Sequence, residues 1–181
     1  MLGKYKVIRL LGKGKSGNSY LVNCNGNEFV LKQMHNEEVF YYNFSKPKIE
    51  LEIEAYPVLQ TFNINIPSLV EYDIENSRLV KEYIKGDTIA ELLRNNCVDE
   101  SMIYKMLLWE KMLKQKEVNI DYFPTNFVYN GNEIYYIDYE YNTYSDEWSF
   151  SDWGIYYWLN PEGFRKFIET GDSGWINIAG T

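Results

Sequence analysis

The chain has 181 residues, of which 45% are hydrophobic and 17% aromatic. This is enough apolar material for a packed core, and it argues against a disordered chain. Its formal net charge of -8 at pH 7 argues against nucleic acid or an anionic membrane as a primary partner. It has two cysteines with no CxxC spacing and no apolar run of membrane-spanning length, a pattern typical of a reduced cytoplasmic protein without a structural zinc site.

The first part of the chain is expected to form an antiparallel sheet with one helix. Alternating and β-branched segments are predicted as strands, and Asn25-Gly26 is a strong signal for a two-residue hairpin. The predicted strands are 5–11, 19–23, 28–33, 69–74 and 78–83. The predicted helix is 48–60, with Pro57 late in it, a residue that kinks or ends helices.

The second part is expected to be mainly helical. Its only other predicted element is a small hairpin of 127–129 with 134–137. The predicted helices are 88–94, 100–116 with Asp99 as N-cap, 149–159, and 161–169 with Pro161 at its start. Strands followed by helices indicate an α+β chain with segregated lobes, 1–85 and 86–181.

A glycine-rich stretch separates the first two predicted strands. Gly12, Gly14 and Gly17 follow a G-x-G-x-x-G spacing, but they lead into a strand rather than into the helix of a dinucleotide-binding unit. A glycine turn between antiparallel strands lets backbone N–H groups approach phosphates closely, because no Cβ intrudes. An ordinary flexible turn is the alternative that this motif alone leaves open.

A lysine and a glutamate are placed to form a pair. Lys32 lies near the end of the predicted strand 28–33, one hairpin after the glycine turn, where a lysine is either a solvated edge charge or a group that holds nucleotide phosphates. The following helix offers three glutamates. Glu52 is expected to face the sheet because apolar residues after it anchor the helix, whereas Glu50 and Glu54 are expected in solvent.

Three oxygen-bearing side chains follow further along the chain. Asp121 and Asn126 are five residues apart, and Asp138 follows the small hairpin. Carboxylate and amide oxygens suit Mg²⁺, although Asp and Asn also cap ordinary turns. Neither segment is decisive alone. The ordered set of glycine turn, lysine, helix glutamate, Asp-x4-Asn and second Asp favours a nucleotide site.

This ordered set resembles the protein-kinase-like superfamily over residues 5–159. The segment 79–86 (LVKEYIKG) is similar to the hinge of bacterial and atypical kinases, and 121–126 is similar to the catalytic loop. The segment 137–140 (IDYE) is similar to the metal-binding motif of choline and aminoglycoside kinases. Asp152 lies in a segment similar to the helix whose Asp braces the catalytic loop.

The resemblance implies a bilobal α+β fold, with a five-stranded antiparallel N-lobe and a reduced, mainly helical C-lobe that bind Mg-ATP between them. It implies that the backbone from Glu82 to Ile84 hydrogen-bonds adenine and that the glycine turn covers the phosphates. Lys32, held by Glu52, would hold the phosphates.

For the C-lobe, the resemblance implies that Asn126 and Asp138 hold Mg²⁺. Asp121 would orient the acceptor hydroxyl and take its proton. Two departures stand out: Asn119 replaces the usual histidine before Asp121, and only thirteen residues separate Asp138 from Asp152. The trimmed C-lobe is similar to those of Rio and lipopolysaccharide-core kinases, and an aromatic cluster at 148–158 is expected to replace the missing packing.

The leading hypothesis is therefore a small atypical, bacterial-type serine/threonine kinase, monomeric and cytoplasmic, that uses ATP and Mg²⁺. Two alternatives stay open. One is a pseudokinase that binds nucleotide or acts as a scaffold without turnover, and the other is a phosphotransferase for small molecules of the aminoglycoside or choline type. The acceptor itself is not readable from these residues.

Overall fold

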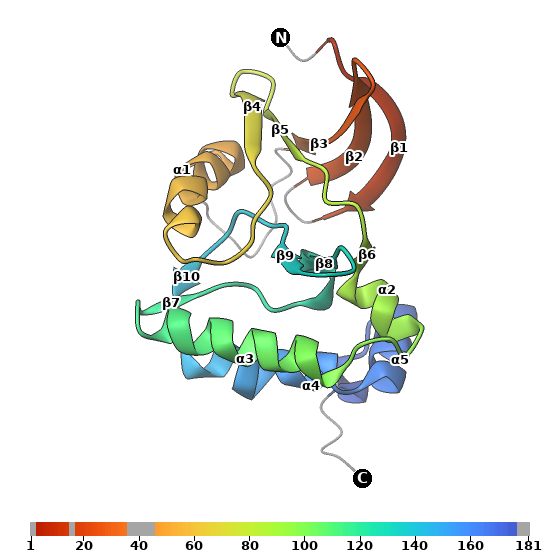
Figure 1. Ribbon diagram of the computed structural model, residues 1–181, viewed down its shortest axis with the longest axis vertical. Coiled ribbons are helices and arrows are strands. Elements are labelled where there is room, and N and C mark those ends of the chain that lie inside the picture. The colour runs from red at the N-terminus through yellow and green to blue at the C-terminus, as the bar shows by residue number, and fades with distance from the viewer. Residues whose placement is uncertain (1–2, 15–16, 36–45, 177–181) are drawn as a thin grey trace. The chain divides into compact units, whose positions relative to one another are not determined.

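The chain folds into two compact units, which a computed structural model describes in detail (Figure 1). The described residues are 3–14, 17–35 and 46–176. The first unit comprises Met1–Val58 and Pro67–Ile84, and the second comprises Leu59–Ile66 and Lys85–Thr181. The α+β class expected from the sequence is confirmed, because one unit is built on a five-stranded antiparallel sheet and the other is mainly helical.

Residues 59–66 belong to the second unit, although the sequence assigns all of 1–85 to the first lobe. The reason is a set of contacts with the small hairpin and its continuation. The Asn65 carbonyl accepts the Tyr136 N–H at 2.8 Å, and the Asn65 side chain donates to the Ile134 carbonyl at 3.1 Å. The ring of Phe62 packs edge-on against Tyr141.

The sheet of the first unit has the strand order β1-β2-β3-β5-β4, and every neighbouring pair is antiparallel. Its strands are β1 (Lys6–Lys13), β2 (Gly17–Cys24), β3 (Asn27–Met34), β4 (Leu69–Asp73) and β5 (Arg78–Glu82). The turn between β2 and β3 is Asn25-Gly26 as predicted, and both residues have the positive φ that this short hairpin requires.

Helix α1 (Lys48–Gln60) has the predicted bounds, and it continues for three residues beyond Pro57. The helix places Ile49 in a buried cluster with Met34 and Leu79 of the sheet. Packing of its apolar side, rather than local helix propensity, therefore fixes which residues of α1 face the sheet.

The second unit contains four α-helices and two small sheets among its described residues. The helices are α2 (Ile89–Arg94), α3 (Glu100–Lys114), α4 (Ile155–Trp158) and α5 (Pro161–Thr170). One sheet has the order β6-β8-β9, and the other pairs β7 with β10. Their strands are β6 (Asp87–Thr88), β7 (Val118–Asn119), β8 (Phe127–Tyr129), β9 (Ile134–Tyr136) and β10 (Asn142–Thr143).

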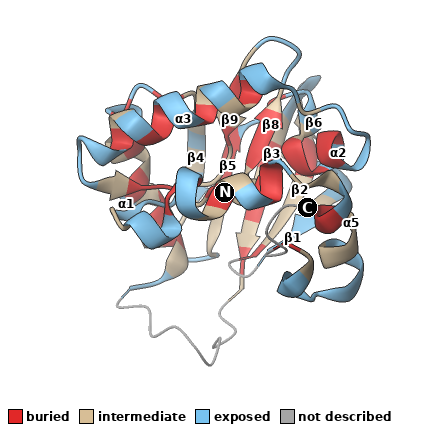
Figure 2. Ribbon diagram, turned by 90° about the horizontal axis from the view of Figure 1, so that it is seen from below, coloured by how far each residue is buried: buried red, intermediate tan, exposed pale blue. Residues whose placement is uncertain are grey.

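Capping side chains begin the two helices that follow Gly86. Thr88 and Glu91 form a reciprocal capping box at α2, and the Asp99 carboxylate accepts from the N–H groups of Ser101 and Met102 at α3. The buried stripe of α3, visible in Figure 2, is as predicted. Its apolar members are Met102, Met106, Trp109 and Leu113.

The helix predicted over 149–159 is irregular. Its first part is a π-helical turn, Phe150–Gly154, and only Ile155–Trp158 is α-helical. Gly154 lies so close to Tyr122 that a Cβ would come within 2.7 Å of the tyrosine Cβ. The wide turn thus brings this segment against the residue that follows Asp121.

The aromatic core of the second unit differs in part from the expected cluster at 148–158. Phe150, Tyr157 and Trp158 are buried, but Trp148 and Tyr156 are about half exposed. Phe127 stacks on Tyr122 and packs at a tilt against Tyr136. The remaining fully buried rings come from elements outside 148–158. They are Tyr122, Phe127, Tyr136, Tyr139 and Phe164.

Candidate functional site

The first unit joins a sheet lysine to a helix glutamate. Lys32 of β3 and Glu52 of α1 form an ion pair, and both side chains are more than 90% buried. Glu54 is exposed and pairs with Lys46 at 2.6 Å, and Glu50 is half-buried. Of the three helix glutamates, the geometry thus brings Glu52 to Lys32. The pair is buried, so removing one partner would leave an uncompensated charge in the interior.

A second buried lysine was not anticipated from the sequence. Lys81 of β5 is only 5% exposed and lies opposite Val30, so it shares a sheet face with Lys32. The one available signal is a lysine directly after the apolar pair Leu79 and Val80, a placement that is equally typical of a solvated edge charge. Lys32 and Lys81 thus place two lysine side chains on one buried face of the sheet.

The three glycines of the turn are not equivalent. Gly14 and Gly17 exchange backbone hydrogen bonds of 2.8 and 3.4 Å, and residues 15–16 between them lie outside the described residues. A Cβ on Gly17 would collide with the backbone of Gln33 and Met34 in β3. A Cβ on Gly12 would meet no atom within 4 Å. Chain packing therefore requires glycine at 17 but not at 12.

Glu82, predicted to lie in the hinge, forms hydrogen bonds within the first unit. Its N–H donates to the Ser68 carbonyl at 2.9 Å, and its carboxylate accepts from the Ser68 N–H and hydroxyl at 3.0 Å. Ile84, the last residue of that unit, has a buried side chain. A base at this hinge would therefore have to use backbone groups other than the Glu82 N–H.

The second unit brings Asp121, Asn126 and Asp138 into one hydrogen-bonded arrangement. The Asn126 side-chain amide donates to the Asp121 carbonyl at 3.4 Å, and the Asn126 carbonyl accepts the Ile137 N–H at 2.8 Å. Ile137 directly precedes Asp138, so the backbone of one loop fixes the other. With its amide N–H directed at Asp121, the Asn126 side-chain oxygen is left as its acceptor end.

Each carboxylate also has a local backbone contact. The Asp121 carboxylate accepts the Phe123 N–H at 3.0 Å, and that of Asp138 accepts the Tyr139 N–H at 3.1 Å. Contacts of this kind also occur in ordinary turns, the alternative left open by the sequence. What a turn does not explain is that the hydrogen bonds of Asn126 connect the loop of Asp121 to the separate loop of Asp138, with all three residues half-buried.

Asn119 takes part in holding the loop that begins at Asp121. It pairs with Asn142 in the short β7–β10 ladder, and its side-chain amide donates to the Ser145 carbonyl at 2.8 Å. The segment before Asp121 is thereby tied to the segment after Asp138. The two-residue strands are too short to show any periodicity in the sequence.

The expected brace from Asp152 is not found. Asp152 is exposed, and its described hydrogen bond is the donation from its backbone N–H to the Ser149 hydroxyl. The loop is held instead by Trp158, whose indole N–H donates to the Tyr122 carbonyl at 2.9 Å. The π-helical turn at Phe150–Gly154 shifts the register between Asp152 and Trp158, which the sequence pattern did not reveal.

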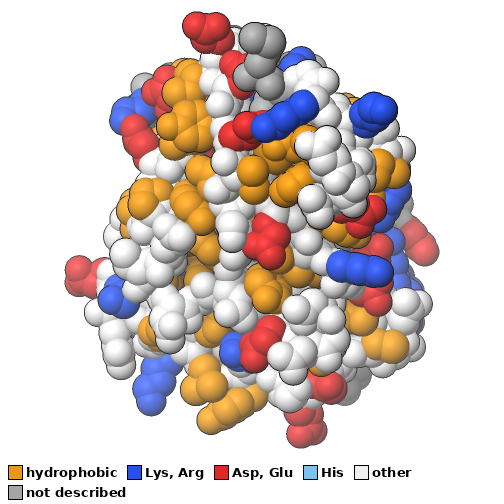
Figure 3. Space-filling view, turned by 45° about the horizontal axis from the view of Figure 1, so that its top comes forward, with side chains coloured by type: hydrophobic (Ala, Val, Ile, Leu, Met, Phe, Trp, Pro, Cys, Tyr) orange, Lys and Arg blue, Asp and Glu red, His pale blue; other side chains and the backbone are white. Residues whose placement is uncertain are grey.

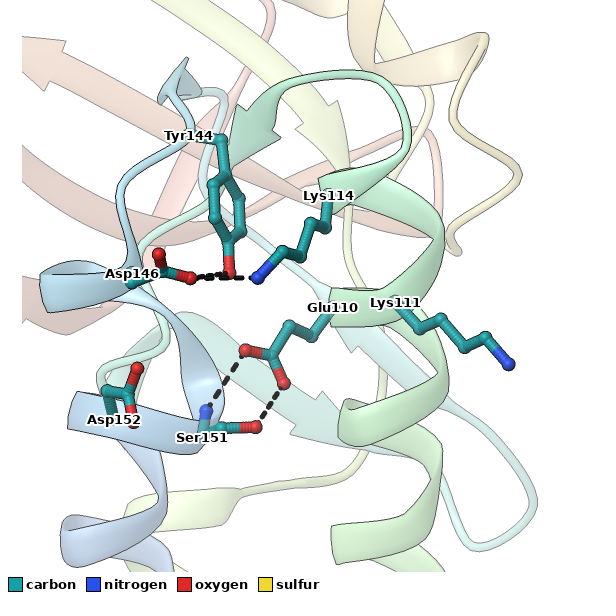
Figure 4. Close-up of a pocket in the computed structure, with 7 residues that line it drawn as sticks. All are labelled: Glu110, Lys111, Lys114, Tyr144, Asp146, Ser151 and Asp152. Atoms are coloured by element: carbon teal, nitrogen blue, oxygen red, sulfur yellow. Dashed lines mark hydrogen bonds and ion pairs between the residues drawn. The ribbon is translucent and has the colours of Figure 1, made fainter.

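A polar pocket of about 250 Å³ lies between α3 and the segment before α4 (Figure 4). Asp152 lines it, but none of the residues predicted to bind nucleotide, metal or acceptor does. Lys114 pairs with Asp146 at 2.8 Å. This contact and the one with Tyr144 raise the pKa of the Lys114 ammonium group. The Glu110 carboxylate accepts from the N–H and hydroxyl of Ser151. Because these charges are satisfied within the pocket, they serve to hold the two segments together.

The donor set of the second unit fits a metal that arrives with a nucleotide. Among the described residues, no group of three or more His, Cys, Asp or Glu side chains could hold a metal ion. Mg²⁺ prefers six oxygen ligands and is commonly bound by one or two carboxylates together with phosphates and water. Asn126 and Asp138 could supply the protein oxygens of such a site.

Two surface properties bear on partners. Acidic and basic side chains are interspersed on the face shown in Figure 3, so the described side chains of that face form no continuous basic patch. In the described parts of the chain, no helix has both the length and the apolar character needed to cross a membrane.

Comparison with known proteins finds two partial similarities. The chain is 29% identical over 95 residues to a probable bifunctional tRNA threonylcarbamoyladenosine biosynthesis protein of Methanococcus vannielii. It is 28% identical over 81 residues to the KEOPS complex subunit Bud32 of Pyrococcus abyssi. These matches cover 52% and 43% of the chain, but only 17% and 37% of the two relatives. No protein-family model matches the chain.

These similarities agree with the architecture described above. The α+β chain with its five-stranded antiparallel sheet has a protein-kinase-like fold. The similarity is not specific to bacterial kinases, since the relatives come from Methanococcus and Pyrococcus.

Proposed function

We propose that the chain is an ATP-dependent kinase that transfers the γ-phosphoryl group of Mg-ATP to a hydroxyl group, with serine or threonine of a protein as the first acceptor to test. The observation that carries the proposal is the joining of Asp121, Asn126 and the segment of Asp138 through the Asn126 hydrogen bonds. The buried Lys32–Glu52 pair adds a fixed cation for phosphate.

Each site residue would have a distinct role in phosphoryl transfer. Mg-ATP supplies the phosphoryl group and a metal that offsets negative charge on the phosphates. Asn126 and Asp138 would bind the metal through their side-chain oxygens. Lys32 would neutralise phosphate oxygens while Glu52 fixes its ammonium group. Asp121 would orient the acceptor hydroxyl and take its proton, since a carboxylate within hydrogen-bond reach can act as a general base.

The direct test is transfer from γ-labelled ATP with Mg²⁺ by the protein alone, with a generic basic protein, and with a panel of aminoglycosides and choline. Transfer to protein serine or threonine is expected. Asp146→Asn is a suitable control, because Asp146 is an exposed acid of the second unit that contacts Lys114 and Tyr144. Transfer only to a small molecule would replace the protein-kinase proposal by that of a small-molecule phosphotransferase.

Binding can be tested apart from turnover. A ligand that binds only the folded state stabilises it, so Mg-ATP should raise the melting temperature more than ATP with a chelator does. No change at millimolar Mg-ATP would contradict nucleotide binding altogether. Binding without transfer to any acceptor would favour the pseudokinase alternative.

The similarity to a KEOPS complex subunit supports a second candidate, in which the chain acts as a nucleotide-binding subunit of a complex concerned with tRNA modification. This candidate conflicts with two expectations from the sequence, namely that the chain is a monomer and that it has no nucleic-acid partner. Sedimentation velocity with and without tRNA measures both the oligomeric state and the binding of tRNA. Binding of tRNA by the chain alone would overturn the expectation drawn from its negative charge.

A further inference from the structure

Tyr136 stands out because its side chain lies between the two loops of the candidate site. It is the last residue of β9, pairs with Phe127 of β8, and is completely buried. It lies two residues before Asp138, and its backbone N–H is fixed by the Asn65 carbonyl at 2.8 Å. Its ring packs against that of Phe127, with centroids 5.3 Å apart.

The hydroxyl of Tyr136 contacts both loops at once. It accepts the backbone N–H of Asp121 at 3.4 Å and donates to the carbonyl of Glu140 at 3.0 Å. One oxygen atom therefore connects the loop that carries Asp121 to the residue two positions after Asp138. The phenol ring, held by its packing, sets where this oxygen lies.

The two contacts use different capacities of the same hydroxyl. Its proton is donated to the Glu140 carbonyl, and its oxygen accepts the Asp121 N–H.

Tyr122 provides a comparison within the same core. It is equally buried, and its ring stacks on Phe127. Its hydroxyl, however, has no hydrogen-bond partner among the described residues. The two tyrosines thus fill similar space, but only the hydroxyl of Tyr136 links Asp121 to the Asp138 loop.

We propose that Tyr136 is a positioning residue, whose hydroxyl sets the location of Asp121 relative to Asp138. The inference rests on the proposed function, because positioning matters for turnover only if these two carboxylates act on one reaction. Displacement of a reacting group by about 1 Å can lower a rate by roughly 10²-fold. Loss of this contact should therefore act on kcat, with less effect on binding of ATP.

The test compares Tyr136→Phe with Tyr122→Phe, each of which removes one oxygen and keeps the ring. For Tyr136→Phe, kcat is expected to fall by about tenfold or more, with KM for ATP within about threefold of wild type. For Tyr122→Phe, both constants should stay within about twofold, because a hydroxyl without a partner is removed. Equal effects of the two changes on kcat would overturn the proposal.

A second measurement does not depend on turnover. Exchange of the Asp121 amide hydrogen, followed by NMR on the wild-type chain, should be slow because Tyr136 accepts it. It should be faster in Tyr136→Phe and unchanged in Tyr122→Phe. Rapid exchange in the wild type would overturn the contact itself. Slow exchange in a chain that neither binds nor turns over Mg-ATP would instead contradict the proposed function and leave the contact standing.

Discussion

The two units hold their candidate site residues in different ways. In the first unit, Lys32 and Glu52 are joined side chain to side chain, between a strand and a helix, and both are buried. In the second unit, Asp121 and Asp138 are half-buried and lie in loops that backbone hydrogen bonds, Asn126 and Tyr136 hold together.

Because of this difference, we expect substitutions in the two units to affect stability and activity to different degrees. A buried ion pair strongly destabilises a protein when one partner is removed, because the other charge is left without compensation. The loops of the second unit depend mainly on main-chain contacts, which survive a change from carboxylate to amide. We therefore expect substitutions in the first unit to affect folding and binding together, and those in the second unit to affect chemistry with less effect on folding.

The largest effect is expected from breaking the buried pair. Lys32→Met should abolish turnover and lower the free energy of unfolding by about 3–5 kcal/mol, because Glu52 is left as a buried charge. Denaturant unfolding followed by circular dichroism and a kinase assay measure the two effects. Glu52→Gln should impair turnover more than Glu50→Gln or Glu54→Gln.

The double change Lys32→Met/Glu52→Leu sharpens this test. Replacing both members by apolar residues removes the uncompensated charge, so most of the lost stability should return while turnover stays absent. A double variant as unstable as Lys32→Met would mean that the pair contributes through more than its charge. A stable and active Lys32→Met would contradict the assigned role of the lysine.

The next largest effect distinguishes the roles of the two carboxylates in the second unit. Asp138→Asn should weaken binding of Mg-nucleotide, because a metal ligand is lost. Asp121→Asn should leave that affinity nearly unchanged and lower kcat by roughly 10²-fold, the scale for loss of a positioned general base. Calorimetry with a non-hydrolysable ATP analogue and steady-state kinetics provide the readouts. Small and equal effects of both changes would identify Asp121 as a turn residue.

A smaller effect tests the glycine turn. Gly17→Ala should destabilise the first unit by about 1–3 kcal/mol, since its Cβ collides with the backbone of β3. Gly12→Ala has open space around its Cβ and should fold normally, but it should weaken nucleotide binding if phosphates approach that backbone. Melting temperatures with and without Mg-ATP distinguish the two. Unchanged affinity in Gly12→Ala would reduce the glycine stretch to an ordinary turn.

The smallest effect is expected at the N-cap of α3, which belongs to neither set of candidate site residues. Hydrogen bonds from the Ser101 hydroxyl and the Met102 N–H lower the pKa of Asp99. Its contribution to stability is therefore present above the usual pKa of an Asp, about 3.9, and is lost as the pH falls through the lowered folded-state value. Asp99→Ala should cost about 0.5–2 kcal/mol at neutral pH, whereas Asp99→Asn should keep the cap and remove its pH dependence. Unfolding curves at neutral and acid pH for both variants test this.

Local signals in the sequence determined most of the elements and the identity of the first pair. The Asn25-Gly26 hairpin, the bounds of α1 and the N-cap at Asp99 follow from turn chemistry, apolar spacing and capping preference, which act between near neighbours. The choice of Glu52 over Glu50 and Glu54 also followed from helix periodicity, because only one side of α1 faces the sheet.

Only the tertiary structure decided which residues hold the loops of Asp121 and Asp138 together. Tyr136, Trp158 and Asn65 act through hydrogen bonds to segments far apart in the chain, and no periodic pattern encodes such contacts. The π-helical turn that leaves Asp152 exposed, and the burial of Lys81, likewise depend on how neighbouring elements pack. The sequence by itself specified the elements and the polar residue types of the site, because these depend on local chemistry. Packing between distant segments decided their supporting contacts.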